Sequence, residues 1–229
     1  MWRQQLESVL FLHWPAPAAF LRRYVPPVLA IDQFDGQAWV SLVVMRMHVM
    51  NTALPFPTLR FNQVNLRTYV RYGEQSGIWF FSVHANHHLA VTTARLATPI
   101  PYQVAFIQYG FATLEKFAHA KCNRSCRLRL ALRFSVNAEL AVCDPLHTWL
   151  LERYHLFTLG QQGRLLLGTF RHPPWLTQTV QIARCHLQAA PIDQALFSEP
   201  PALAHFSPGT EGEFGTFQQL CPAHHSDNT

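Results

Sequence analysis

The chain has 229 residues, of which 49% are hydrophobic and only 14% are charged, so its composition is globular and excludes a disordered protein. The formal charge is +5, and all the basic residues are arginines except Lys116 and Lys121. The densest basic cluster, at residues 121–133, is short and has no aromatic stacking motif beside it, so we expect no nucleic-acid partner.

The first half of the chain reads as a short helix followed by strands. Prolines bracket a helix expected at residues 18–24, and turn residues precede a β-rich run at 38–45. Two further strands are expected at 64–72 and 78–85. Between them, residues 73–77 supply turn chemistry, so these strands should form a hairpin with a longer loop.

The second half returns to strands around one helix. In residues 126–134 leucines alternate with arginines, which is the period-two pattern of a strand with one wet face. Asp144 is suited to cap a helix that has Pro145 in its first turn, and apolar residues follow at three- and four-residue spacings. Strands are expected again at 165–170 and 179–187.

No repeat or flexible linker divides the chain. We expect a single domain over residues 1–221, followed by a polar, disordered tail at 222–229. Many short strands around one mid-chain helix favour a closed or nearly closed sheet. The fold class is therefore expected to be mainly β with a few short helices.

Cysteines and the N-terminal residues indicate the compartment. The five cysteines are odd in number and widely scattered, which makes a poor disulfide framework. The first twelve residues include Arg3 and Glu7, and their only apolar run, at 9–12, is followed by His13 and two prolines. Neither a signal-peptide core nor a membrane span fits this pattern. We expect a cytoplasmic protein with no membrane partner.

Two groups of potential metal ligands are weak signals. His119, Cys122 and Cys126 lack the second ligand pair that structural zinc requires, so a basic loop is the simpler interpretation. Residues 84–88 contain three histidines, but a polar loop is commoner there than a three-histidine metal site. No phosphate-binding loop and no Gly-x-Ser-x-Gly motif is present. We expect no metal and no cofactor.

The most informative stretch is residues 61–72, FNQVNLRTYVRY. At strand periodicity, one face of this stretch carries Gln63, Asn65, Arg67, Tyr69 and Arg71. One interpretation places this polar face in water, where solvated strand faces are common. The other places it inside a barrel, where an arginine flanked by amide and phenol groups binds an anionic or carbonyl-bearing small molecule. The pattern alone leaves both open.

Six blocks of the sequence together resemble the YqjF-like family, a domain of unknown function in the acetoacetate decarboxylase-like superfamily. The blocks are LFLHWPAP (10–17), VPPVLAIDQFDGQAWVSLV (25–43), NLRTYVRYGEQSGIWFFSVHA (65–85), LLERYHLF (150–157), HPPW (172–175) and ALAHFSPG (202–209). They occur in the expected order and extend over nearly the whole chain. The resemblance implies a closed antiparallel β-barrel-like fold around a central cavity.

The chain departs from this superfamily at two positions. Acetoacetate decarboxylases use a lysine Schiff base, whose amine is activated by a depressed pKa. The comparable turn here, residues 99–103, has no lysine, which argues against Schiff-base chemistry. Relatives usually carry Glu where this chain has Gln63, and an amide does not exchange protons near neutral pH. Either a reaction that needs the carboxylate is lost here, or the position only forms hydrogen bonds.

With the implied fold, we interpret the polar strand as lining a cavity. Arg67 is then the leading candidate for anion recognition, with Asn65, Tyr69 and Gln63 as its neutral neighbours. Arg95 is a candidate for a second cationic group, unless it only forms a surface ion pair.

Three residues are weak catalytic candidates. His172 is fixed by the prolines that follow it, and is either a base or a structural donor beneath Trp175. Glu152 belongs either to a catalytic site or to a polar network at the end of a helix. Tyr102 lies near the position of the decarboxylase lysine.

Three kinds of function stay open. The first is binding of a small organic acid or carbonyl compound in a barrel cavity, without Schiff-base chemistry. The second is a lyase, hydratase or isomerase of the same superfamily that works through Arg67 and either His172 or Glu152. The third is a structural or interaction protein with a filled barrel. A homodimer is also open, since barrels with exposed edges often pair.

Overall fold

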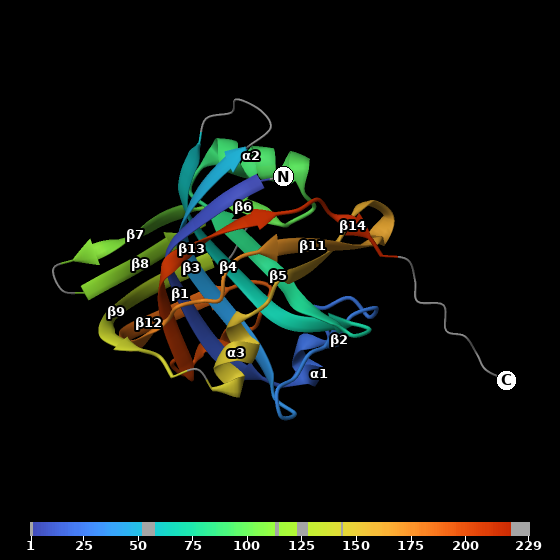
Figure 1. Cartoon of the computed structure of the whole chain (residues 1–229). Coiled ribbons are helices and arrows are strands. Elements are labelled where there is room, and N and C mark those ends of the chain that lie inside the picture. Colours follow the sequence, from blue (N-terminus) through green and yellow to red (C-terminus); the bar gives the residue numbers. More distant parts are fainter. Residues whose placement is uncertain (1, 52–57, 113–114, 123–127, 143, 221–229) are drawn as a thin grey trace.

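A computed structural model describes residues 2–51, 58–112, 115–122, 128–142 and 144–220. Most of these residues lie in strands of one continuous fourteen-stranded sheet. The protein is therefore mostly β, as the sequence predicts (Figure 1). The tail expected at 222–229 lies outside the described residues.

Seven strands of the sheet form a closed ring. In spatial order they are β11 (Leu165–Arg171), β10 (His155–Leu159), β5 (Gln75–Ala85), β4 (Leu59–Tyr72), β3 (Ala38–Asn51), β1 (Trp2–Ala16) and β13 (Leu203–Phe214). The ring closes because β13 pairs with β1 and also with β11, where Phe170 lies opposite Phe214. β5 and β10 run parallel, so the ring is not the wholly antiparallel one implied by the family resemblance.

The sheet continues beyond the ring as a wing of four strands, which lies at the left of Figure 1. The wing consists of β12 (Gln178–Ala189), β9 (Leu128–Leu140), β8 (Glu115–Lys121) and β7 (Phe106–Ala112). Three short strands pair with members of the ring: β2 (Ala30–Ile31), β6 (Tyr102–Val104) and β14 (Gln218–Gln219).

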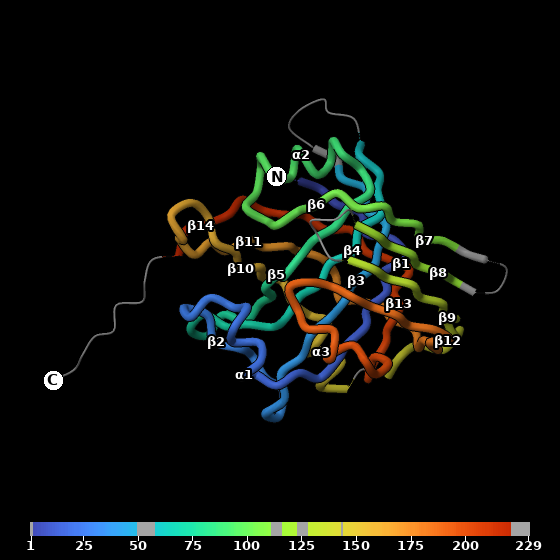
Figure 2. Tube along the Cα trace, turned by 180° about the vertical axis from the view of Figure 1, so that it is seen from behind, coloured from blue at the N-terminus to red at the C-terminus, as the bar shows by residue number. Residues whose placement is uncertain are grey.

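The helices are few and short. They are α1 (Ala18–Leu21), α2 (His88–Ala97) and α3 (Pro145–Leu151), with 3-10 turns at Gln161–Gly163 and Gln194–Phe197. Figure 1 places α2 at the top of the molecule and α1 and α3 at the bottom, and Figure 2 shows the same arrangement from behind.

Both faces of β4 are buried, which decides where its polar residues lie. Val64 and Leu66 pack into a hydrophobic core that they share with residues of the wing strands β7, β8, β9 and β12. Gln63, Asn65 and Arg67 alternate with them on the other face, and they are only 4%, 2% and 9% exposed. The interpretation that placed this polar face in water is therefore wrong.

Strands predicted from sequence periodicity are present as β3, β4, β5, β9, β11 and β12, although β3, β4 and β9 extend further than predicted. The predicted capping of α3 is also present. The Asp144 carboxylate accepts a hydrogen bond from the His147 backbone N–H at 2.6 Å, and Pro145 occupies the first turn.

Three local predictions differ from the structure. Helix α1 ends at Leu21 instead of continuing to residue 24. The β4–β5 hairpin has a two-residue turn instead of a longer loop, since Tyr72 pairs directly with Gln75. The histidine-rich residues 84–88 are not a polar loop: they end β5 and start α2, where the His87 ring accepts a hydrogen bond from the Ala90 backbone N–H.

The cysteine pattern differs from expectation as well. Cys122 forms a disulfide, whereas Cys185 is free. The scattered cysteines therefore do not exclude disulfide formation, and a cytoplasmic location stays a prediction. As for membranes, the helices in the described residues are too short or too polar to span a bilayer.

Closure of the ring depends on a glycine where β5 meets β10. A Cβ atom on Gly77 would lie 2.8 Å from the His155 carbonyl oxygen and 2.8 Å from the Phe157 ring. Gly77→Ala should therefore force the two strands apart and lower the free energy of unfolding by about 1–3 kcal/mol in urea denaturation. At Gly215 the only atom within reach is 3.7 Å away, so Gly215→Ala should change stability by less than about 0.5 kcal/mol. Equal effects of the two variants would contradict this account.

Candidate ligand-binding site

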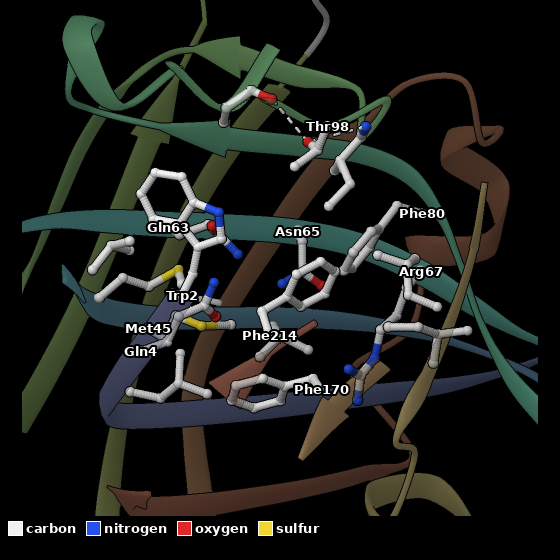
Figure 3. A pocket seen from close by; sticks show the side chains of 18 of the residues that line it. Trp2, Gln4, Met45, Gln63, Asn65, Arg67, Phe80, Thr98, Phe170 and Phe214 are labelled. Atoms are coloured by element: carbon white, nitrogen blue, oxygen red, sulfur yellow. Dashed lines mark hydrogen bonds between the residues drawn. The ribbon is translucent and has the colours of Figure 1, made fainter. Parts of the chain in front are cut away.

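A cavity of about 180 Å³ lies within the strand ring. β4 contributes three polar residues to its lining, and Figure 3 shows Gln63, Asn65 and Arg67 in a row along that strand. Aromatic side chains of Phe80, Phe170 and Phe214 surround them. The ring is thus not completely filled by its own side chains.

Arg67 is a buried cation without an anionic partner in the described residues. Its Nε and Nη2 atoms are buried and have no hydrogen-bond acceptor there. Its guanidinium carbon lies 5.7 Å from the centre of the Phe11 ring, and burial lowers the pKa of the guanidinium. A desolvated charge with unused donors is costly, and a bound acceptor would relieve that cost.

Asn65 and Gln63 continue the polar row. The Oδ1 atom of Asn65 is buried and has no donor in the described residues. Gln63 is already engaged, because its Oε1 accepts a hydrogen bond from the Tyr102 hydroxyl at 3.2 Å. Burial raises the pKa of Tyr102 to about 12, so this phenol stays protonated and acts as a donor.

A second arginine reaches the cavity, but its charge is balanced. Arg153 donates to Asp32 at 2.8 Å, and both side chains are less than 9% exposed. Its Nε donates to the Trp149 carbonyl, and its guanidinium lies 4.2 Å from the centre of the Trp149 ring. Sequence reasoning missed this pair, because 121 residues separate the two partners and no local pattern connects them.

Arg95 does not supply the second cationic group, so that expectation is corrected. Arg95 is exposed on α2 and outside the cavity lining, where its Nε donates to the Tyr102 carbonyl oxygen. Arg153 occupies the position that Arg95 was expected to have.

Tyr69 shares the face of Arg67 but lies behind the cavity wall. Its hydroxyl donates to the Leu150 carbonyl at 3.0 Å and therefore accepts from the Ser41 hydroxyl at 2.6 Å. Ser41 in turn accepts from Nδ1 of His13 at 2.7 Å, which leaves the buried His13 Nε2 as the ring's unprotonated nitrogen. Tyr69 thus connects α3 to β3 and does not line the cavity.

His172 lies at the edge of the cavity inside an aromatic group. Its ring centre is 4.8–5.0 Å from those of Tyr154, Phe170 and Trp175. Nδ1 donates to the Pro173 carbonyl at 2.7 Å, so Nε2 is the free, basic nitrogen of the neutral ring. Burial lowers the pKa of His172, and the hydrogen bond to Pro173 partly offsets that effect.

Glu152 holds this group in place. Its carboxylate accepts from the Tyr154 hydroxyl at 2.5 Å and from the Trp175 backbone N–H at 2.8 Å. Glu152 is not part of the cavity lining. Its position favours the structural alternative, a polar network at the end of a helix, over a role as a base.

A group of three buried histidines lies beside Arg67 and was not anticipated. The ring centres of His13 and His205 are 5.3 Å apart, and those of His205 and His147 are 4.4 Å apart. Burial is the largest cause that lowers all three pKa values, with repulsion from neighbouring histidines adding to it for His13 and His205. The three come from distant parts of the chain, so no sequence spacing reveals them.

In the described residues, no three His, Cys, Asp or Glu side chains converge so as to hold a metal ion. Cys126, one of the weak zinc candidates, lies outside those residues. His119 is exposed on β8, and His84 is buried at the end of β5.

Sequence comparison with known proteins identifies the family of this chain. Residues 3–211 match the sequence model of the DUF2071 family, which is described as an uncharacterized conserved protein. The uncharacterized protein YqjF of Bacillus subtilis (strain 168) is 36% identical over 184 residues, which cover 78% of this chain and 76% of YqjF.

Solved structures agree at the level of fold. An acetoacetate decarboxylase-like enzyme from Sphingomonas wittichii RW1 superposes with a TM-score of 0.69 at 12% identity, over 96% of this chain and 92% of that one. The enduracididine biosynthesis enzyme MppR, complexed with pyruvate, gives 0.67 at 11% identity, over 96% and 90%. Acetoacetate decarboxylase from Legionella pneumophila gives 0.68 at 12% identity, over 96% and 87%. This chain therefore has the acetoacetate decarboxylase-like fold.

The two cavity arginines should respond oppositely to substitution by methionine. Arg67→Met removes a buried charge that has no partner, so we expect the free energy of unfolding to rise by about 1–3 kcal/mol. Arg153→Met leaves Asp32 buried and unpaired, so we expect a loss of about 3–5 kcal/mol. Urea denaturation of the ligand-free protein measures both. A destabilised Arg67→Met variant would show that Arg67 is a structural group.

Stability should depend on pH through the buried histidines. Burial lowers the pKa of His84 and of His205 from 6.5 to about 4, so between these pH values the unfolded chain binds more protons than the folded one. The contribution to stability is therefore complete above pH 6.5 and is lost as pH falls towards 4. We expect each residue to account for about 2 kcal/mol of the stability lost between pH 7.5 and 5.

Urea denaturation at the two pH values tests this on single variants. His205→Gln should remove its share of the pH dependence, whereas the same change at His186, which is exposed on β12, should not. An unchanged pH dependence in the His205→Gln protein would refute the assignment.

Proposed function

We propose that this chain, which belongs to the DUF2071 family of uncharacterized conserved proteins, binds a small organic acid or carbonyl compound inside its strand ring. The observation that carries the proposal is Arg67, whose buried guanidinium has donors without acceptors in the described residues and faces the cavity. An anionic or carbonyl oxygen supplies the missing acceptor with a charge-assisted hydrogen bond.

The composition of the cavity supports binding without a Schiff base. The described lining has no lysine, whereas Schiff-base chemistry needs an amine at the reacting carbon. Lys116 lies on β8, outside the lining, with its Nζ 3.3 Å from the centre of the Phe206 ring. The comparable enzyme MppR holds pyruvate within the same fold at 11% identity, which is consistent with a keto acid as one class of ligand.

A second candidate function is acid–base catalysis as a lyase or isomerase. The observation that favours it is His172, whose Nε2 is unprotonated and whose ring borders the same cavity as Arg67. In such a reaction Arg67 would hold the carboxylate and His172 would accept a proton from the adjacent carbon. Glu152 would act through its contacts with Tyr154 and Trp175, as a positioning residue.

Thermal shift with pyruvate and acetoacetate tests the binding proposal. We expect both acids to raise the Tm of the unmodified protein. Neither acid should change the Tm of Arg67→Met, because this variant lacks the guanidinium that donates hydrogen bonds to the carboxylate. Arg95→Met is the matched control, since Arg95 lies outside the cavity, and it should keep the full shift.

Equal shifts in the unmodified protein and in Arg67→Met would overturn the role of Arg67. Borohydride treatment in the presence of either acid should leave the protein mass unchanged. A covalent adduct at Lys116 or Lys121 would instead restore the Schiff-base mechanism.

A further inference from the structure

The charges around the cavity limit the ligand to a single negative charge. Arg153 is neutralised by Asp32 at 2.8 Å, which leaves Arg67 as the one unbalanced cation among the described lining residues. His172 faces the cavity as a neutral ring with one donor already used. A second carboxylate on the ligand would be desolvated there without a partner, at a large cost.

The size of the cavity limits the enclosed part of the ligand. An apolar cavity of about 150 Å³ holds one benzene molecule of six carbon atoms. By that measure the 180 Å³ found here enclose about seven nonhydrogen atoms. A carboxylate uses three of them, so about four atoms remain for the body of the ligand.

The lining away from Arg67 is mostly apolar, with Gln4 and Gln63 as polar members. Along the β3–β4 ladder, Arg67 lies opposite Ser41, Gln63 lies opposite Met45, and Phe61 lies opposite Met47. Figure 3 shows Arg67 and Phe170 on one side of the cavity, and Met45 and Trp2 on the other.

The lining is partly exposed on both sides of the cavity. Trp2, Val49 and Leu59 are only partly buried on the side away from Arg67, and Phe170 and His172 are partly buried on the Arg67 side.

Asn65 adds a second polar contact between these two sides. It lies two residues from Arg67 on the same strand face, which corresponds to about 7 Å along β4. Its buried Oδ1 has no donor among the described residues, whereas the neighbouring Gln63 already accepts a hydrogen bond from Tyr102. The acceptor at Asn65 therefore calls for a hydroxyl group on the ligand, a short distance from its carboxylate.

We propose that the preferred ligand is a short-chain hydroxy monocarboxylate, with its carboxylate on Arg67, its hydroxyl on Asn65 and its alkyl tail against the apolar lining beside them. This inference rests on the proposed function and deepens it. 3-Hydroxybutanoate, with about seven nonhydrogen atoms, fits the charge, the volume and the position of the hydroxyl.

Isothermal titration calorimetry of the full chain tests the inference with matched probes. From acetate to butanoate to pentanoate, each added methylene should tighten binding about fourfold, and the gain should level off once the ligand exceeds the enclosed volume. 3-Hydroxybutanoate should bind about fivefold more tightly than butanoate. Succinate and butan-1-ol should each bind at least tenfold more weakly than butanoate. Succinate carries a second carboxylate that would have no cationic partner, and butan-1-ol has no carboxylate to pair with Arg67.

Asn65→Leu separates the hydroxyl contact from the rest of the site. The variant should still bind both acids through Arg67, but it should lose the preference for 3-hydroxybutanoate over butanoate. Asn65→Ala serves as a second variant if the leucine disturbs folding, as judged by circular dichroism.

The outcomes distinguish this inference from the proposed function. If no carboxylate binds, or if binding survives in Arg67→Met, the proposed function itself fails. If carboxylates bind through Arg67 but affinity is independent of chain length, favours succinate, or keeps the hydroxyl preference in both Asn65 variants, only this inference is overturned.

Discussion

The buried guanidinium of Arg67 is the constraint on which the rest of the site depends. A cation with unused donors is tolerated inside a small β protein only if the surrounding packing holds it there and a function requires it. Phe11 lies against the guanidinium, whose carbon is 5.7 Å from the centre of the Phe11 ring, and Arg67 also lines the cavity. Asp32, the nearby buried acid, is already paired with Arg153 and is not available to Arg67.

The two faces of β4 divide the protein into two regions with different tasks. Val64 and Leu66 belong to a core that is packed densely between the ring and the wing. The polar face between them lines a space that is not filled. Structural stability and ligand recognition thus depend on alternate residues of the same strand. A shift of register by one residue would move the apolar residues of β4 into the cavity and its polar residues into the core. The long ladders to β3 and β5 therefore fix the site as well as the fold.

The sequence predicts those features that are local. Alternation identifies most strands, Asp144 with Pro145 identifies the start of α3, and the polar row of β4 identifies Gln63, Asn65 and Arg67. Features that depend on distant partners are not predictable from such patterns. The Arg153–Asp32 pair, the three-histidine group and the closure of the ring at β11 and β13 each join segments far apart in the chain. Helix α2 was missed for a different reason, because a histidine serves as its N-cap.

The hairpin of β10 and β11 is joined to the ring far less firmly than the other strands. Two residue pairs connect β10 to β5 and two connect β11 to β13, whereas the ladders of β1, β3 and β4 each run for ten pairs or more. Side-chain packing therefore holds this hairpin to the ring more than its ladders do, since Phe157, Leu165 and Leu167 are buried in a core that includes Val70 of β4. Because Leu156 and Phe170 of the hairpin also line the cavity, the packing that joins the hairpin to the ring also forms one wall of the space around Arg67.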